Sequence, residues 1–396
     1  MTLAVGDEVD VLLERPAHGG ASVGRFEGQV VFVRHGIPGE RVRVTVTEVG
    51  PKARFVRADV IRVDEPSDDR VEPRCPHAVP GGCGGCDWQH VALPRQRTMK
   101  AEIVREQLVR LGGMDAHDPL VSGLVVESCG EDDGFGYRTR MDFVADPRGR
   151  LGLRAARSHE VIALRGCPLA VDAINDADDL RRPWGAGGTV RFASTADGVI
   201  VTPEEAEAPT AHEIVDGERF DVAADGFWKV HRNAARVFTD IALHLLQPRA
   251  GEFLLDLYGG AGLFARMLAP TLGPGGRILL VEYDRRAGRL ARRNLRHLPN
   301  ADVVVERTDR WLTGRQLSRT DLVILDPPRA GAGATVMAEV LRLRPRRVLY
   351  VACDPSSLAR DIATARSHGY VPTALRSVDA FPQTAHIETF ALLERG

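Results

Sequence analysis

The stretch FLLDLYGGAG, residues 253–262, decides the fold of the C-terminal part of this 396-residue chain. Its first residues are mostly apolar and predict a buried strand, and the glycines that follow let a ligand approach the backbone at the carboxyl end of that strand. From about residue 226 onward, strand patterns alternate with helix patterns, as in a parallel α/β sheet. We therefore predict a Rossmann-like α/β domain over residues 226–396, with Gly260 and Gly262 beside a bound ligand.

The glycine loop and two acidic residues indicate which ligand this is. The loop reads D-x-x-G-G-x-G, which departs from the spacing of a dinucleotide-binding fingerprint and is closer to the loops of S-adenosylmethionine-binding proteins. The next strand pattern ends at Glu282, whose carboxylate can accept both hydroxyls of a ribose. A third strand pattern, residues 303–308, places Asp309 where it could touch an adenine. Three motifs in this order predict a site for S-adenosylmethionine.

A cysteine lies at another turn from strand to helix. In YVACDPSSLARD, residues 350–361, a buried strand pattern leads to Cys353, and Pro355 marks the turn before a helix that begins at Ser356 or Ser357. A free thiol has a pKa of about 8.5, and a helix N-terminus lowers that pKa and makes the sulfur a better nucleophile. The functional interpretation is therefore a nucleophile. The alternative is a small residue buried in the core.

Two further motifs follow or precede strands of the same domain. Asp326-Pro327-Pro328-Arg329 comes after a short apolar strand, and its prolines leave backbone carbonyls exposed at the rim of the site. A similar D-P-P occurs in amino-group methyltransferases, but an aromatic residue follows it there, whereas arginine follows it here. In FPQTAHIETF, residues 381–390, Glu388 enters a closing strand. Judged alone, Glu388 would be a solvated residue and His386 a structural one.

The strongest spacing signal lies nearer the N-terminus. Cys75, Cys83 and Cys86 form a C-x7-C-x2-C pattern, and Cys167 follows much later in the chain. Four thiolates on loops rich in glycine and proline can hold a zinc ion or an iron-sulfur cluster. Disulfides are a poor alternative in a cytoplasmic protein. Glycines beside the ligands leave backbone amides free to approach cluster sulfurs, which favours the iron-sulfur cluster, with zinc as the alternative.

The rest of the chain divides into two β-rich parts. Residues 1–63 alternate short strand patterns with glycine turns, which predicts a five-stranded barrel of the oligonucleotide-binding kind, and they resemble a TRAM domain, an RNA-binding module, in GGASVGR (19–25) and GIPGE (36–40). Residues 64–225 carry the cysteines and strand-and-turn patterns, which predicts a central domain with a β-sheet. Within it, apolar residues recur at helical intervals over 96–111, and we expect this helix to pack on the C-terminal domain.

The composition limits the partners and the location. The net charge is only −2, but arginines cluster in residues 41–62 and 285–296, and each cluster is either a phosphate-facing surface or a solvated face. The sequence has no run of about 18 apolar residues and no signal-peptide pattern near Met1. We therefore expect a cytoplasmic, monomeric protein that has no membrane partner.

Together these motifs resemble the iron-sulfur-containing, TRAM-domain RNA 5-methyluridine (uracil-C5) methyltransferases, over nearly the whole chain. The resemblance implies a class I methyltransferase domain that binds S-adenosylmethionine, an RNA substrate, and a [4Fe-4S] cluster on the four cysteines. It implies that Cys353 is the nucleophile and that Glu388 is the general base. It places the cofactor against Tyr258, Glu282, Asp309 and Asp326.

One residue departs from the pattern of that family. Relatives usually read F-x-Q-x-N where this chain reads FWKVH, residues 227–231, so Lys229 replaces a glutamine that contacts the cofactor. The chain has only three lysines against 49 arginines, which makes this lysine notable. An ammonium would repel the sulfonium of the cofactor but could attract its methionyl carboxylate. We hypothesise that Lys229 binds this carboxylate or alters the affinity for the cofactor.

The chemistry of the family explains why it needs a cysteine and a base. Carbon 5 of uracil is too weak a nucleophile to take a methyl group unaided, so the Cys353 thiolate attacks carbon 6 and generates an enolate. After methyl transfer, Glu388 removes the proton from carbon 5 and the cysteine leaves. The expected substrate is 23S ribosomal RNA, with uridine 54 of transfer RNA as the alternative. An amino-group methyltransferase and a non-catalytic iron-sulfur RNA-binding protein are alternatives of other classes.

Overall fold

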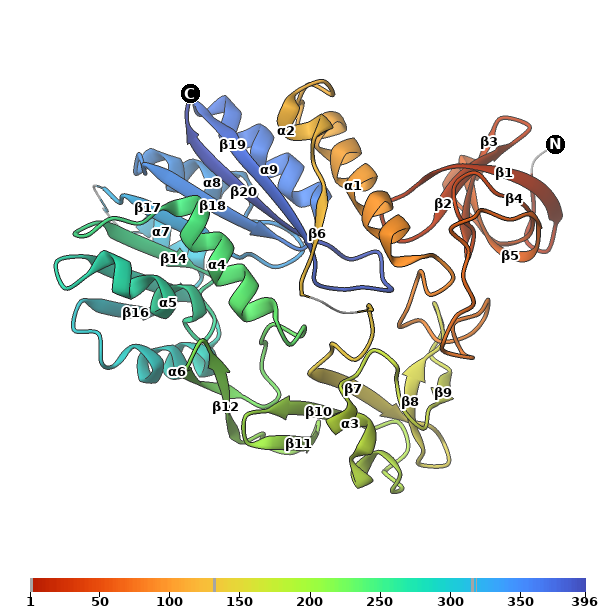
Figure 1. Ribbon diagram of the computed structural model, residues 1–396, viewed down its shortest axis with the longest axis horizontal. Coiled ribbons are helices and arrows are strands. Elements are labelled where there is room, and N and C mark those ends of the chain that lie inside the picture. The colour runs from red at the N-terminus through yellow and green to blue at the C-terminus, as the bar shows by residue number, and fades with distance from the viewer. Residues whose placement is uncertain (1–2, 131–132, 315–316, 318) are drawn as a thin grey trace.

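The computed structural model describes residues 3–130, 133–314, 317 and 319–396. Figure 1 shows a small barrel near the N-terminus, a middle part built from short strands, and a larger part in which helices flank a sheet. The predicted fold class is confirmed for the barrel, the β-rich middle and the mixed α/β C-terminal part. No helix within the described ranges combines the length and apolar character that crossing a bilayer requires.

The N-terminal barrel closes in the order β1-β2-β3-β5-β4. Its strands alternate buried valines with exposed polar residues, so that the valines fill the interior. The elements are β1 (Glu8–Pro16), β2 (Ser22–Phe26), β3 (Gln29–Arg34), β4 (Arg41–Val49), the short 3-10 turn η1 (Pro51–Ala53) and β5 (Phe55–Glu65).

Four arginines of the barrel are neutralised by carboxylates. Arg41, Arg43, Arg57 and Arg62 each form an ion pair with a carboxylate of the same barrel. These pairs are largely exposed, and exposed pairs add little stability. Their main effect is to neutralise these four arginines of the cluster in residues 41–62, which the sequence analysis interpreted as either a phosphate-facing surface or a solvated face.

The middle part is a five-stranded sheet in the order β11-β10-β7-β8-β9, with a separate two-stranded pair β12-β13. Phe143 and Phe192 meet edge to face in its core, with ring centroids 5.3 Å apart. The elements are β7 (Arg140–Ala145), β8 (Leu151–Arg154), β9 (Val161–Ala163), α3 (Asp172–Asp176), η2 (Asp178–Leu180), β10 (Thr189–Thr195), β11 (Gly198–Pro203), β12 (Thr210–Val215) and β13 (Glu218–Ala223).

The C-terminal sheet has eight strands in the order β16-β15-β14-β17-β18-β20-β19-β6. The strands β14 to β18 are parallel, whereas β20 runs antiparallel to both β18 and β19. The strands are β14 (Phe253–Leu257), β15 (Arg277–Glu282), β16 (Ala301–Val305), β17 (Leu322–Leu325), β18 (Arg347–Ala352), β19 (Tyr370–Asp379), β20 (Glu388–Arg395) and, from earlier in the chain, β6 (Val126–Ser128).

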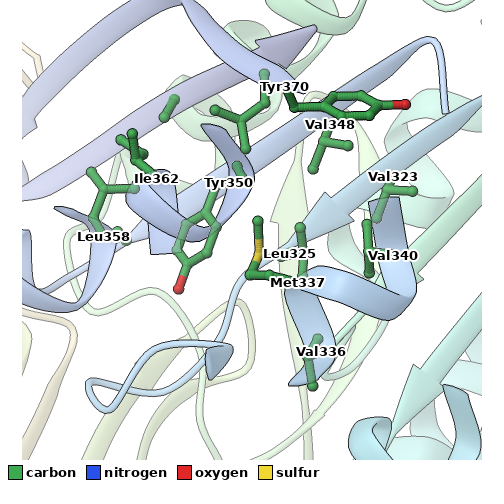
Figure 2. Close-up of a cluster of buried hydrophobic side chains, with 14 of the residues drawn as sticks. Val323, Leu325, Val336, Met337, Val340, Val348, Tyr350, Leu358, Ile362 and Tyr370 are labelled. Atoms are coloured by element: carbon green, nitrogen blue, oxygen red, sulfur yellow. The ribbon is translucent and has the colours of Figure 1, made fainter. Parts of the chain in front are cut away.

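Helices cover both faces of this sheet. Alternate residues of one strand therefore face different cores: Val323 and Leu325 point to one face, and Leu322 and Ile324 to the other. Figure 2 shows part of the first core, where side chains of β17 and β18 pack on α8 and α9. The helices are α1 (Leu93–Arg110), α2 (Pro119–Ser122), α4 (Ala234–Leu246), α5 (Leu263–Leu272), α6 (Arg285–Leu295), α7 (Thr308–Gly314), α8 (Gly333–Arg342) and α9 (Pro355–Ser367).

Two local expectations differ from the structure. The third strand pattern was predicted over residues 303–308, but β16 ends at Val305 and Thr308 already begins α7. Asp309 therefore lies in the first turn of a helix, where its negative charge is favourable, and not at the end of a strand. The second difference is that α9 begins at Pro355, because proline suits the first helical position.

Candidate active site

A cavity of about 1130 Å³ lies at the carboxyl ends of the parallel strands, which is where open α/β sheets bind their ligands. Side chains and loops from β14, β15, β17, β18 and β20 line it. The structure thus brings together most of the residues that the sequence singled out as catalytic or cofactor-binding. The members of that set on the cavity wall are Lys229, Tyr258, Gly260, Glu282, Asp309, Asp326, Cys353 and Glu388.

The glycine loop is held open by backbone hydrogen bonds. Gly260 donates its N–H to Glu282 Oε2 over 2.8 Å, and Asp284 donates to Glu282 Oε1 over 2.6 Å, so both carboxylate oxygens of Glu282 are oriented. A Cβ added at Gly260 would meet no atom, so space beside the loop is free. Gly262, predicted beside the ligand, is not part of the cavity wall and instead starts α5 with a φ of 90° that favours glycine.

Asp256, the first residue of the D-x-x-G-G-x-G motif, is a site residue that the sequence analysis did not single out. It is fully buried, and its Oδ2 accepts a hydrogen bond from the N–H of Ala265 over 3.1 Å. Its Oδ1 has no partner within the described residues. Burial raises the pKa of Asp256 to about 8. The carboxyl therefore ties the strand to the first turn of α5, and its place in the motif was the available signal.

Tyr258 and Asp309 meet at the far end of this cavity. Tyr258 has a left-handed φ of 62° and lines the cavity together with Thr308, which precedes Asp309. Burial raises the pKa of Tyr258 to about 12. Asp309 pairs with Arg307, whose Nη2 lies 2.8 Å from Asp309 Oδ2, and this hydrogen bond lowers the pKa of Asp309 to about 2. Asp309 is therefore ionised at neutral pH.

Cys353 follows β18 directly, and the next residue begins the capping of α9. Asp354 accepts a hydrogen bond from the N–H of Ser357 over 2.7 Å, which satisfies one of the free donors at the helix start. The expectation that the helix lowers the pKa of the thiol is wrong for this structure. Burial, and then the carboxylates of Glu388 and Asp326, raise the pKa of Cys353 to about 11. The thiol therefore needs a base to become a thiolate.

Glu388 is the carboxyl in this cavity with properties of a base. Only 5% of its surface is exposed, and its Oε2 has no hydrogen-bond partner among the residues the structure describes. Burial raises the pKa of Glu388 to about 7, although the charge of Lys229 opposes this rise. A carboxyl with a pKa near neutrality can both accept and release a proton under ordinary conditions.

Lys229 is paired with a carboxylate of the protein. Its Nζ lies 2.7 Å from Asp326 Oδ2, and the rings of Phe227 and Phe238 lie 5.3 and 5.0 Å from the same nitrogen. Burial opposes the charge of Lys229, but Asp326 and then Glu388 outweigh it and raise the pKa of the ammonium. The cavity thus contains a fixed cation between two carboxylates.

The four predicted ligand cysteines surround a second, smaller cavity of about 30 Å³. The N–H of Gly85 donates to the sulfur of Cys83 over 3.4 Å, and Gln89 Nε2 donates to the sulfur of Cys86 over 3.1 Å. Donors of this kind stabilise thiolates. Across residues 3–130, 133–314, 317 and 319–396, however, no three cysteine, histidine or acidic side chains form a group that could hold a single metal ion.

Hydrogen bonds with segments far away in the sequence hold the loop before Glu388. Gln383, with a left-handed φ of 67°, exchanges two side-chain and backbone hydrogen bonds with Gln96 of α1. Its carbonyl accepts the N–H groups of Asp87 and Trp88, each over 3.0 Å. The segment of the cysteines and α1 therefore position the loop before Glu388 across a long sequence separation, for which the sequence contains no local signal.

Comparison with known proteins supports the same assignment of parts. The family model of the TRAM domain matches residues 3–61, and the model of tRNA (Uracil-5-)-methyltransferase matches residues 219–396. An uncharacterized RNA methyltransferase of Streptomyces coelicolor is 39% identical, covering 98% of this chain and 93% of the relative. The 23S rRNA (uracil(1939)-C(5))-methyltransferase RlmD of Edwardsiella ictaluri is 31% identical, covering 95% and 93%.

One solved structure resembles the whole chain. The tRNA (uracil-54, C5)-methyltransferase of Pyrococcus abyssi, solved in complex with S-adenosyl-L-homocysteine, superimposes with a TM-score of 0.71. The match covers 97% of this chain and 99% of that one, at 20% sequence identity. At this identity the likeness establishes a shared fold.

Proposed function

Because this chain belongs to the family of S-adenosylmethionine-dependent RNA (uracil-5-)-methyltransferases, we propose that it methylates a specific uridine in structured RNA by covalent catalysis. The observation that carries this proposal is the cavity in which Cys353, Glu388 and the glycine loop meet. A nucleophile, a base and a cofactor loop in one cavity are what methylation of carbon 5 of uracil requires. The target base has to leave its stack to enter such a cavity.

In the proposed mechanism, Cys353 and Glu388 act in turn. Ionised Glu388 accepts the proton of the Cys353 thiol and releases it to solvent. The thiolate then forms a bond to carbon 6 of the uracil, which breaks the π bond between carbons 5 and 6 and moves that electron pair into an enolate. Bound S-adenosylmethionine supplies the methyl group to carbon 5. Glu388, with a pKa of about 7, then accepts the proton of carbon 5, and the bond between Cys353 and carbon 6 breaks. Glu388 then passes the proton from carbon 5 to the Cys353 thiolate, so the thiol and the ionised carboxylate are restored, and one proton per methyl group has been released to solvent.

The cofactor site is assigned to residues along the same strand ends. We propose that Glu282 accepts the ribose hydroxyls, because its oxygens are already oriented by two backbone N–H groups. Asp309 would accept from the adenine, and Tyr258 and Gly260 would line the space between them. Asp326, held by Lys229 over 2.7 Å, lies between this region and the catalytic pair.

The four cysteines are proposed to hold a [4Fe-4S] cluster, with zinc as the alternative. The cavity that they surround and the two N–H···S hydrogen bonds support a thiolate-bound group, and the glycines beside the cysteines favour the cluster over zinc. Anaerobic purification followed by analysis of iron, sulfide and zinc tests this assignment. Iron and acid-labile sulfide in equal amounts are expected, and stoichiometric zinc without sulfide would contradict the cluster.

The substrate is proposed to be 23S ribosomal RNA, with uridine 54 of transfer RNA as the second candidate. The 31% identity to a 23S rRNA methyltransferase over most of both chains favours the first. The barrel that matches the TRAM model adds a second RNA-facing part to the catalytic domain.

Trapping with 5-fluorouridine tests the mechanism and the substrate together. Fluorine at carbon 5 cannot leave as a proton, so the enzyme should remain bound to methylated RNA through Cys353. The protein would be incubated with S-adenosylmethionine and cellular RNA containing 5-fluorouridine, and the adduct analysed by denaturing mass spectrometry and RNA sequencing. An adduct that is absent from Cys353→Ala supports the proposal. Methylation without any adduct would contradict covalent catalysis.

A further inference from the structure

Five lysine and arginine side chains line the large cavity, and they differ in whether a carboxylate neutralises them. Three are paired over 2.6 to 2.8 Å: Lys229 with Asp326, Arg286 with Asp225, and Arg307 with Asp309. The other two, Arg138 and Arg329, have no carboxylate partner within the described part of the chain. Two uncompensated cations therefore face a cavity that is proposed to hold RNA.

Arg138 lies between the two cavities of the molecule. It lines the small cavity of the four cysteines and also the large cavity of Cys353. Its backbone is held on both sides: its N–H donates to the carbonyl of Leu169 over 2.8 Å, and it forms a β-bridge with His231. Its Nε is buried and has no partner within the described residues. The backbone is thus fixed while the guanidinium keeps donors to offer.

Arg329 approaches the same region from the other side of the cavity, after the two prolines of the D-P-P-R motif. Its Nη2 lies 3.4 Å from Nε2 of His386. Burial lowers the pKa of His386, and the charges of Arg329, Lys100 and Arg138 lower it further, while Asp87 opposes them. His386 is therefore neutral at neutral pH. The neutral ring of His386 therefore leaves the charge of Arg329 uncompensated.

We propose that Arg138 and Arg329 form a phosphate-binding site that holds the RNA backbone beside the extruded uridine. This inference rests on the proposed function of the cavity. A guanidinium presents donors in a planar fork that matches the oxygens of a phosphate, and charge-assisted hydrogen bonds of this kind are strong. The site would fix the position of the nucleotide relative to Cys353, while the base enters the cavity.

The two arginines are attached to segments other than the glycine loop, and comparing RNA binding with S-adenosyl-L-homocysteine binding distinguishes a phosphate from the other anion available, the carboxylate of the cofactor. Arg138 is bridged to the Cys167 loop through Ala170, and Arg329 contacts His386 of the catalytic loop. The proposed ribose and adenine contacts, Glu282 and Asp309, lie instead beyond β15 and β16. The same location links the RNA site to the cysteines, since the loop of Cys167 holds the backbone of Arg138.

Binding measurements test the site without requiring turnover. A fluorescent oligouridylate of about ten nucleotides would be titrated at several salt concentrations with the wild type, Arg138→Gln and Arg329→Gln. Arg249→Gln is the matched control, because Arg249 is exposed and precedes the amino end of β14, whereas the cavity lies at the carboxyl ends of the strands. Calorimetry with S-adenosyl-L-homocysteine measures the cofactor site in the same proteins.

Each cavity variant should weaken RNA binding about tenfold, because it loses a charge-assisted contact, and should lower the salt slope by about 0.7 per phosphate. Arg138→Lys should keep the slope, because it keeps the charge. Affinity for S-adenosyl-L-homocysteine and the behaviour of Arg249→Gln should not change. The proposal would be overturned if the cavity variants showed an unchanged salt dependence of RNA binding, or if they lost affinity only for S-adenosyl-L-homocysteine. If the wild type binds RNA but methylates none, the proposed function fails while the phosphate-binding site stands.

Discussion

Two buried lysine-aspartate pairs occupy different surroundings in this molecule, although both join residues far apart in the sequence. Lys100 and Asp379 are both fully buried, and the ammonium also donates to the carbonyl of Phe381 over 3.0 Å. Burial lowers the pKa of Lys100 in spite of its partner. Lys229 and Asp326 instead line the large cavity, and the second carboxylate, Glu388, helps raise the pKa of the lysine.

The difference in surroundings determines what each lysine-aspartate pair can do. The pair of Lys100 is fully buried and joins α1 to the end of β19, just before the loop that leads to Glu388, so its role is structural. The pair of Lys229 faces the reacting groups, so its charge acts on them directly. The same two residue types thus position a catalytic loop in one place and set the charge of a base in the other.

The largest expected effect is on stability, at the pair of Lys100 and Asp379. Lys100→Met keeps the volume of the side chain but removes the closer of two cations from the buried carboxylate of Asp379, which keeps only Arg97, with Nε 3.6 Å from Oδ2. Loss of one member of a buried pair costs about 3 to 5 kcal/mol. Guanidinium unfolding should therefore show a large fall in the free energy of unfolding of the C-terminal domain. The double variant Lys100→Met/Asp379→Leu removes both charges and should recover most of it; a single variant as stable as the wild type would refute the comparison.

The next effect is on activity, at the pair of Lys229 and Asp326. In the wild type, kcat/KM should rise as the pH increases through about 7, because only ionised Glu388 can accept a proton. The charge of Lys229 lowers the pKa of Glu388, so Lys229→Gln raises it. The midpoint of the profile should therefore move to higher pH, with roughly a tenfold loss of kcat/KM at pH 7 and recovery under alkaline conditions.

The same variant separates this role from cofactor binding. Equal affinity of wild type and Lys229→Gln for S-adenosyl-L-homocysteine, together with a shifted pH profile, would assign Lys229 to the base and not to the methionyl carboxylate. A weaker affinity without a shift in the profile would support the opposite assignment. Stability should change less than at Lys100, because 7% of the Lys229 side chain and 19% of that of Asp326 are exposed.

The sequence predicted the surroundings of Lys229 and Asp326 better than those of Lys100 and Asp379. Asp326, Cys353 and Glu282 follow parallel strands, and the carboxyl ends of such strands meet at one edge, so their meeting could be inferred from strand order. Lys100 and Asp379 are 279 residues apart and lie in no motif. The pKa of Cys353 was predicted wrongly because it is raised first by burial and then by the carboxylates of Glu388 and Asp326, and the sequence pattern gives neither the burial of the thiol nor its distance from Glu388.

The smallest effect is expected at Lys52, the third lysine of the chain, which serves as a control for the comparison of Lys100 with Lys229. Lys52 is exposed in the turn η1 of the barrel and forms no ion pair with any described residue. Lys52→Gln removes the same charge as Lys229→Gln but touches neither the cavity nor a buried carboxylate. Exposed substitutions of this kind change stability by less than about 0.5 kcal/mol. Its pH profile should match that of the wild type, since a charge on the barrel surface is screened by solvent before it reaches Glu388. A shift equal to that of Lys229→Gln would mean that net charge, and not the position of the ammonium in the cavity, sets the pKa of the base.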